Sequence, residues 1–169
     1  GMRHCCNSAA IVNFPEMHLD AVRAGILLYG LSPNPGVTDA AGFLPCMTLK
    51  ANVVQLSHIR KGDTVSYGAA FVSDRDMTVA TLSVGYADGL LRALSGKADV
   101  VIRGKKAKMV GKICMDMCMA DVSDIDCEVG DEAVIFGDGQ SADRLAELAG
   151  TINYEILCSV RNRVSRRYI

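Results

Sequence analysis

The stretch LKANVVQLSHIRKGDTVSYGAAFVSDRDMTVATLSV, residues 49–84, decides the fold. It contains three short runs of strand-like composition, Leu49–Ile59, Thr64–Val72 and Met77–Val84. Turn residues separate these runs at 61–63 and at 73–74. Many short strands at this spacing are typical of an antiparallel sandwich or barrel. The stretch therefore predicts a mainly β domain.

The same pattern continues toward the C-terminus. Further strand candidates lie at Val100–Arg103, Ala107–Ile113, Met117–Val122 and Glu132–Phe136. A helix is predicted between Ser141, a suitable N-cap, and Gly150, a suitable C-terminal stop. A second short helix is expected over Tyr154–Val160. The mixture of apolar and basic residues at Val160–Tyr168 predicts a final edge strand.

The first 45 residues have a different character, because all four prolines of the chain lie there. A short helix is expected over Pro15–Ala21, with proline at an acceptable early position. The apolar run Ala24–Tyr29 is typical of a strand buried on both faces, as in a parallel sheet. The segment 31–45 is rich in Pro, Gly, Asn and Asp, which indicates a connector.

These observations predict three parts. Residues 1–33 are expected to be a remnant of the last units of a βα (TIM) barrel, 34–45 a connector, and 46–169 an antiparallel, barrel-like β-domain with a short helix.

Composition argues against several functions. Eighteen basic and nineteen acidic residues give a net charge of −1, so no broad attraction to nucleic acid or to an anionic membrane is expected. The late arginines at 161, 163, 166 and 167 are interpreted as the solvated face of the final strand. No apolar run is long enough to span a bilayer, and no signal peptide opens the chain.

Seven cysteines occur without a paired spacing, which suits a reducing cytoplasm better than a disulfide framework. No CxxC motif is present, and the three histidines are scattered along the sequence. We therefore expect a cytoplasmic protein without a metal site.

Two tyrosines, Tyr67 and Tyr86, each lie beside a glycine in a strand-like run. Glycine lets the backbone bend and bring a phenol close to a ligand. A phenol has a pKa of about 10 and transfers protons usefully only where its surroundings stabilise the phenolate. Taken alone, both tyrosines could equally be aromatic side chains on a barrel surface.

Other polar and soft residues also have two interpretations. Purely structural roles are an ordinary ion pair for Arg23, a helix cap for Ser8, packing for Tyr154, and soft core filling for Cys114, Met115 and Cys118.

Six segments, taken together, favour a functional interpretation. They are CNSAA (6–10), VRAGILLYGLSP (22–33), VSYGAAF (65–71), VGYADG (84–89), VGKICMDMCM (110–119) and INYEILC (152–158). In this order they resemble the successive motifs of the alanine racemases, over the C-terminal portion of that family. The resemblance implies an isomerase that uses pyridoxal 5'-phosphate (PLP) to interconvert L-alanine and D-alanine and so supplies D-alanine for peptidoglycan. It also implies an N-terminal βα-barrel, a C-terminal β-domain, and a head-to-tail homodimer whose active sites combine residues of both subunits.

The resemblance further implies a role for each matching residue. Tyr67 matches the catalytic tyrosine, which serves one face of the substrate while a PLP-linked lysine serves the other. Met115 matches a backbone N–H that binds the substrate carboxylate from the opposite subunit. Arg23 matches the partner of the pyridine nitrogen, and Ser8, Gly25, Ile26 and Tyr154 match the phosphate cradle. Residues around the pocket and its access corridor are matched by Tyr86, Arg92, Cys114, Asp116 and Ile152.

Arginine at the pyridine nitrogen suits racemisation. Its pKa is too high for it to give up a proton, so the pyridine stays largely unprotonated. A weaker electron sink limits the lifetime of the carbanion and favours simple reprotonation.

Two parts of the family's machinery match nothing in this chain, namely the PLP-linking lysine and the histidine that orients the catalytic tyrosine. The segment Leu49–Asn52 superficially resembles the family's KAN sequence, but its β-domain context leads us to interpret Lys50 as a strand residue. Lys112 occupies a position where arginine is common in the family. A compact ammonium group therefore replaces a planar guanidinium that could bind a partner through two hydrogen bonds. We therefore expect the isolated chain not to racemise alanine.

Two alternatives stay open on the sequence. One is a separate non-catalytic module that binds a partner or complements a barrel half in trans. The other is the corresponding domain of a racemase that acts on serine.

Overall fold

The computed structural model describes residues 1–33 and 42–169. Most of the connector predicted at 34–45 therefore lies outside the described residues. The chain divides into two compact units, Gly1–Met47 and Thr48–Ile169, each with its own internal packing. The protein is mainly β with few helices, as the sequence predicts.

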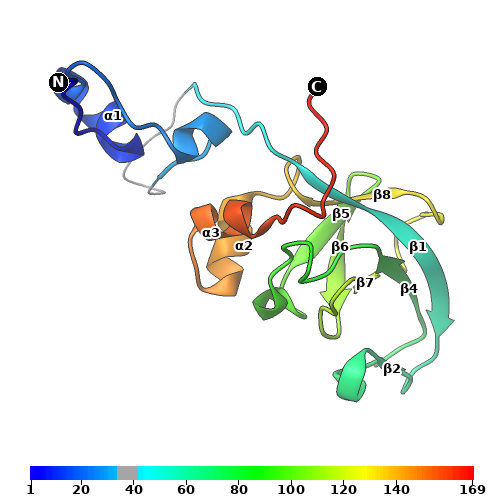
Figure 1. Cartoon of the computed structure of the whole chain (residues 1–169). Helices are drawn as coiled ribbons and strands as arrows, with labels where there is room; N and C mark the ends of the chain where they lie inside the picture. The colour runs from blue at the N-terminus through cyan, green and yellow to red at the C-terminus, as the bar shows by residue number, and fades with distance from the viewer. Residues whose placement is uncertain (34–41) are drawn as a thin grey trace. The chain divides into compact units, whose positions relative to one another are not determined.

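A closed, six-stranded antiparallel barrel forms the centre of the second unit (Figure 1). Its strands are β1 (Leu49–Ile59), β4 (Met77–Leu82), β5 (Asp99–Ile102), β6 (Lys105–Val110), β7 (Cys118–Asp121) and β8 (Glu132–Phe136). Their order around the barrel is β1-β4-β7-β6-β5-β8. The long strand β1 closes the barrel, because its first half pairs with β8 and its second half with β4. Irregular register in both ladders lets β1 bend between its two partners.

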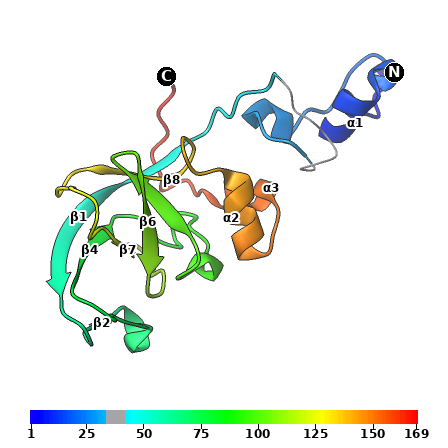
Figure 2. The same ribbon diagram turned by 180° about the vertical axis from the view of Figure 1, so that it is seen from behind.

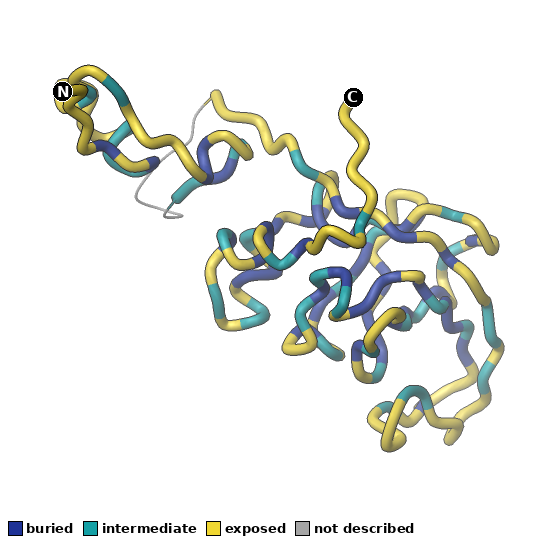
Figure 3. The backbone as a smooth tube through the Cα atoms, viewed as in Figure 1, coloured by how far each residue is buried: buried dark blue, intermediate teal, exposed yellow. Residues whose placement is uncertain are grey.

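The strands alternate between buried and more exposed residues, so one face of each strand fills the barrel interior. Large side chains such as Leu82, Ile102, Met109 and Ile135 are fully buried there. Figure 3 shows this alternation as dark blue segments along the strands. The prediction of an antiparallel β-domain is confirmed, with close agreement at Leu49–Ile59 and Glu132–Phe136.

Two helices, α2 (Ala142–Ala149) and α3 (Asn153–Ser159), follow β8 and pack on each other beside the barrel (Figures 1 and 2). Ser141 Oγ accepts the N–H of Arg144 and caps α2. Gly150 ends that helix with a φ of +74°. The first predicted helix is therefore confirmed in detail, and the second begins one residue earlier than expected.

The strand predicted over Thr64–Val72 is wrong. Two-residue strands β2 (Thr64–Val65) and β3 (Phe71–Val72) flank a 3₁₀ turn, η3 (Tyr67–Ala69). Gly68 has a φ of +69°, which a continuous strand cannot include. We refer to residues 64–72 as the Tyr67 hairpin, which lies at the end of the barrel where β1 finishes (Figures 1 and 2).

The edge strand predicted over Val160–Tyr168 is also wrong. A closed barrel has no free edge for another strand to join. Instead, the Arg166 guanidinium donates to the carbonyls of Val160, Arg161 and Val164 and folds the segment on itself. The late arginines are therefore not the solvated face of a strand.

The described residues of the first unit include α1 (Ser8–Asn13) and the 3₁₀ turns η1 (Pro15–Met17) and η2 (Ile26–Tyr29). The buried strand predicted at Ala24–Tyr29 is wrong, since no strand is present among the described residues of this unit to pair with it. Gly30, with a φ of +71°, donates its N–H to Leu27 O and closes η2.

The helix expected over Pro15–Ala21 shrinks to η1, because Leu19 has a φ of +54° and cannot continue it. Asn7, rather than Ser8, caps α1 by accepting the N–H of Ala10. The structural interpretation of Ser8 as a cap is therefore wrong. Among the described residues no helix has the length and apolar character needed to cross a membrane.

Candidate functional site

The backbone of the Tyr67 hairpin is strained around its tyrosine. Ser66, Gly68 and Ala69 have φ values of +70°, +69° and +48°, and two of these residues carry side chains that disfavour such angles. Tyr67 itself is 77% exposed, so its phenol is presented rather than packed. Clustered strain of this kind persists only where surrounding contacts over-determine it, and it is typical of functional sites.

A neighbouring turn holds the Tyr67 hairpin in place. The N–H of Lys112 donates to Ser66 Oγ at 2.8 Å. Gly111 has a φ of +70°, and a Cβ there would lie 2.8 Å from Ser66 Oγ. The Tyr67 hairpin and the turn at Gly111–Lys112 are thus in close contact, and only glycine fits at position 111.

The base of the hairpin rests on a small apolar cluster. Val65 and Phe71 pack against the buried residues Met77, Val79 and Val110. These last three belong to strands β4 and β6 of the barrel. The strained Tyr67 hairpin is therefore packed against strands β4 and β6 of the barrel.

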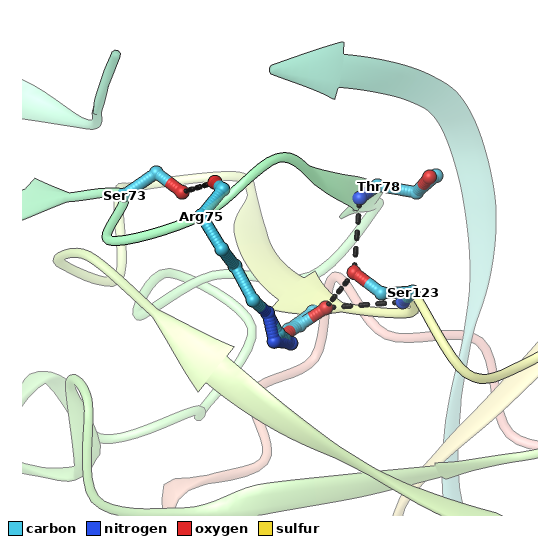
Figure 4. Close-up of polar contacts among 5 residues, drawn as sticks. Ser73, Arg75, Thr78 and Ser123 are labelled. Atoms are coloured by element: carbon cyan, nitrogen blue, oxygen red, sulfur yellow. Dashed lines mark hydrogen bonds and ion pairs between the residues drawn. The ribbon is translucent and has the colours of Figure 1, made fainter. Parts of the chain in front are cut away.

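A polar network fixes the connection from β3 to β4, and Figure 4 shows it. Arg75 Nη2 lies 2.6 Å from Asp121 Oδ2, and Ser73 Oγ donates to the carbonyl of Arg75. Ser123 donates to Asp121 Oδ1 from both its backbone N–H and its hydroxyl, and its Oγ accepts the N–H of Thr78. Burial alone would raise the pKa of Asp121, but the bonds from Ser123 and Arg75 outweigh it and lower that pKa.

Two backbone hydrogen bonds orient the turn that contains Met115. Tyr86 N–H donates to Cys114 O at 3.0 Å, and Ala87 N–H donates to Met115 O at 3.0 Å. In a trans peptide the C=O and the next N–H point in opposite directions. The Met115 N–H is therefore directed away from the Tyr86 backbone.

This contact requires glycine at position 85. A Cβ on Gly85 would lie 2.3 Å from Met115 O, far closer than atoms can approach. The glycine of the VGYADG motif is thus explained by the close approach of two backbones rather than by an unusual φ.

Tyr67 and the Met115 turn line one cavity of about 630 Å³. Its walls also include Cys114 and Asp116, and residues such as Gln55, Val79 and Thr81 from β1 and β4. Four of the predicted site residues are therefore brought together. Met115 is 53% exposed, which excludes its interpretation as core filler, whereas Cys118 is buried and fits that interpretation. Burial raises the pKa of the Cys118 thiol to about 12, so this thiol stays protonated.

The structure reveals an arginine that the sequence analysis did not connect with the site. Arg163 Nε lies 2.8 Å from Asp88 Oδ1, and its Nη2 lies 2.6 Å from Asp116 Oδ1. The hydrogen bond that Arg163 donates to Asp116 raises the pKa of Arg163. Asp88 is buried, and its other oxygen accepts the N–H of Gly85 at 2.9 Å. The only sequence signal for the ion pairs of Arg163 was the cluster of arginines near the C-terminus.

The remaining predicted residues of the second unit lie outside the 630 Å³ cavity. Tyr86 is 44% exposed, and Arg92 is the exposed first residue of η4 (Arg92–Leu94). Ile152 is the exposed N-cap residue of α3, and Tyr154 lies half-buried in the first turn of that helix.

In the first unit three predicted residues lie together. Ser8 is buried, and its Oγ accepts the N–H of Gly25 at 3.0 Å. Ile26 follows directly as the first residue of η2, where an amide has no partner within the helix. Arg23 is directed to a different group, since its Nη1 lies 2.9 Å from His4 Nδ1 and its Nη2 donates to Cys5 O.

Comparison with known proteins identifies the family. Residues 46–168 match the family model described as alanine racemase, C-terminal domain, and residues 1–33 match alanine racemase, N-terminal domain. Alanine racemase 1 of Clostridium acetobutylicum is 49% identical over 174 residues, which cover 99% of this chain and 45% of that protein. The alanine racemase of Desulfovibrio desulfuricans is 48% identical over 171 residues, which cover 100% of this chain and 46% of that protein.

A solved structure agrees with these sequence matches. The crystal structure of alanine racemase from D-cycloserine-producing Streptomyces lavendulae matches with a TM-score of 0.93 at 40% identity, over 99% of this chain and 46% of that one. The present chain thus spans less than half the length of these relatives.

The barrel is therefore the C-terminal β-domain that is characteristic of a family of amino-acid racemases. The chain belongs to the alanine racemase family, which confirms the resemblance seen in its motifs.

Proposed function

We propose that this chain provides the β-domain half of a PLP-dependent racemase that interconverts L-alanine and D-alanine. The observation that carries the proposal is the convergence of the exposed Tyr67 phenol and the Met115 turn on one cavity. A phenol can hold or release a proton at its Oη, and a backbone N–H can bind a carboxylate. Together they suit the α-proton and the carboxylate of an amino acid.

The residues of the first unit fit the phosphate of PLP. The Gly25 N–H donates to Ser8 Oγ at 3.0 Å, which leaves the hydroxyl hydrogen of Ser8 to donate to a phosphate, and the Ile26 amide lies next to them. A hydroxyl and adjacent backbone amides are typical ligands of a phosphate group. When bound, PLP supplies the electron sink that stabilises negative charge at the α-carbon. Arg23 would hold the pyridine nitrogen, and Tyr154 would add a phenol to the phosphate cradle.

The other family positions receive supporting roles in this proposal. Cys114 and Asp116 line the cavity, and Tyr86, Arg92 and Ile152 belong to the pocket and its access corridor. Residues 1–33 form the end of an N-terminal βα-barrel, 34–45 the connector, and 46–169 the C-terminal β-domain. The complete enzyme acts as a head-to-tail homodimer in the cytoplasm and supplies D-alanine for peptidoglycan, without nucleic-acid or membrane partners.

The separate-module and serine-racemase alternatives are not favoured, since the curated relatives are named alanine racemases and this chain matches the models of both alanine racemase domains. Residues 1–169 contain no lysine in the family's PLP-linking context, and Lys50 instead pairs with Glu132 at 2.8 Å on the barrel surface. We therefore expect the isolated chain to show neither racemase activity nor the visible absorbance of lysine-bound PLP.

The proposed role of Tyr67 is tested in the full-length enzyme by Tyr67→Phe. The variant is expected to lose α-proton exchange with D₂O for one enantiomer of alanine and to retain it for the other, because each face has its own base. Racemisation should fall by roughly 10²–10⁴-fold, as is usual when a general acid–base group is removed. The control is Tyr168→Phe, at a tyrosine that is 93% exposed outside the cavity. Equal loss of exchange for both enantiomers, or none for either, would contradict the proposal.

A further inference from the structure

We infer that Arg163 is a positioning residue for the proposed reaction: by binding Asp88 and Asp116 together, it orients the Met115 N–H and neutralises a carboxylate in the wall of the cavity. This inference rests on the function proposed above. It starts from a single guanidinium that bridges two acidic residues from different turns.

The first arm of the bridge acts through Asp88. One oxygen of this buried carboxylate binds Arg163, and the other accepts the N–H of Gly85. Asp88 thereby fixes the conformation of the turn at 85–88. The backbone N–H groups of Tyr86 and Ala87 in this turn donate to the carbonyls of Cys114 and Met115. The direction of the Met115 N–H depends on those two hydrogen bonds, because the peptide group is planar.

The second arm acts directly on Asp116, the residue after Met115. Arg163 Nη2 lies 2.6 Å from Asp116 Oδ1, so the chain is held on both sides of the Met115 peptide. A planar guanidinium can bind two carboxylates at fixed angles, which an ammonium group cannot reproduce. The arginine therefore defines the relative position of the two turns.

The charges support the same role. Asp116 lines the cavity that would receive the substrate carboxylate, and an unpaired carboxylate there would repel that anion. Arg163 stays protonated beside its two acidic partners. Without Arg163, the three-residue cluster would change from one net negative charge to two.

The experiment uses the full-length, PLP-loaded enzyme. Arg163→Gln is expected to raise KM for alanine by about tenfold, because the Met115 N–H loses its fixed direction and Asp116 is left unpaired in the cavity wall. The inhibition constant of propionate, used as a probe of the carboxylate site alone, should rise by the same factor. The change in kcat is expected to stay within about threefold, since Tyr67 lies on a separate turn. Arg163→Lys should retain the charge and raise both constants by only about threefold. Arg161→Gln, at an exposed arginine two residues earlier, is the matched control and should leave both constants unchanged.

A double variant separates the inference from a merely structural role. Adding Asp116→Asn to Arg163→Gln removes the exposed negative charge and should restore part of the affinity for propionate. The inference would be overturned if Arg163→Gln lowered the Tm of the enzyme but left KM for alanine and the inhibition constant of propionate unchanged. If Arg163→Gln does not fold, unchanged constants in Arg163→Lys would overturn it equally. Failure of the unmodified enzyme to racemise alanine would instead refute the proposed function, and this inference with it.

Discussion

The barrel and the Tyr67 hairpin follow opposite physical rules. In the barrel, long antiparallel ladders enclose residues such as Ile102 and Ala133 that have no exposed surface. In the hairpin, two-residue strands flank a turn with three positive φ values and an exposed phenol. Figure 3 shows the difference as a largely yellow hairpin beside a blue-striped barrel. Stability and the proposed chemistry thus lie in adjacent but distinct regions.

This difference shows how a strained site is maintained. Each non-glycine residue in a sparsely populated backbone region costs on the order of 1–3 kcal/mol. The hairpin has few contacts of its own that could offset such a cost. Its support comes from the apolar cluster below it and from the Gly111–Lys112 turn beside it. The barrel can provide this support because its own packing is complete.

The largest effect on stability is expected from Leu82→Ala in β4. Leu82 has 0% exposed surface, and truncation of such a core leucine typically costs about 2–5 kcal/mol through lost burial and the cavity left behind. Chemical denaturation of the chain, followed by circular dichroism, measures this change. Truncation of Leu44, which is 83% exposed, is the control and should cost far less. Equal losses in both variants would contradict the view that the barrel interior carries the stability.

An intermediate effect is expected from Gly111→Ala beside the Tyr67 hairpin. The Cβ of the new alanine would clash with Ser66 Oγ, and the alanine would also have to keep the left-handed φ of the glycine. The combined cost is expected to be about 1–3 kcal/mol. Gly104→Ala is a matched control, because its φ is +74° and no atom lies within 4 Å of its Cβ position. In the full-length enzyme the first variant should lose racemase activity and the control should retain it. Similar activity in both would show that contact between the two turns does not position Tyr67.

The smallest effect concerns pH and the network in Figure 4. Because the folded pKa of Asp121 is lowered, its carboxylate stabilises the fold above the ordinary value of 3.8, and this contribution is lost as the pH falls through the folded pKa. Asp121→Asn should therefore lower the free energy of unfolding at pH 7, and the difference from the unmodified chain should shrink below about pH 4. Denaturation across that range tests this, with Asp138→Asn at an exposed turn as control. A difference that stays constant down to pH 2 would contradict the prediction.

Local signals predicted the regular elements well. The strand Leu49–Ile59 and the helix between Ser141 and Gly150 agree with the structure because composition and capping residues determine them locally. The errors arose where distant contacts decide. Ala24–Tyr29 lacks a pairing strand among the described residues of its unit, and Val160–Tyr168 lies beside a barrel that has no free edge.

The candidate site shows the same division. The motifs identified Tyr67, Cys114, Met115 and Asp116, which the fold brings to one cavity. Arg163 was missed as part of the site because its ion pairs join segments far apart in the sequence, and no local pattern marks such a pairing. The roles proposed for these residues stay predictions until the variants are measured.

The closure of the barrel by its first strand has a kinetic consequence. Leu49, at the start of β1, pairs with Phe136, at the end of β8. During synthesis, β1 emerges long before β8, so the seam between these two strands cannot form until β8 has also left the ribosome. Contacts between residues so distant in sequence slow folding and leave an unpaired strand open to wrong partners. This unit should therefore depend on chaperones during translation more than its thermodynamic stability alone would suggest.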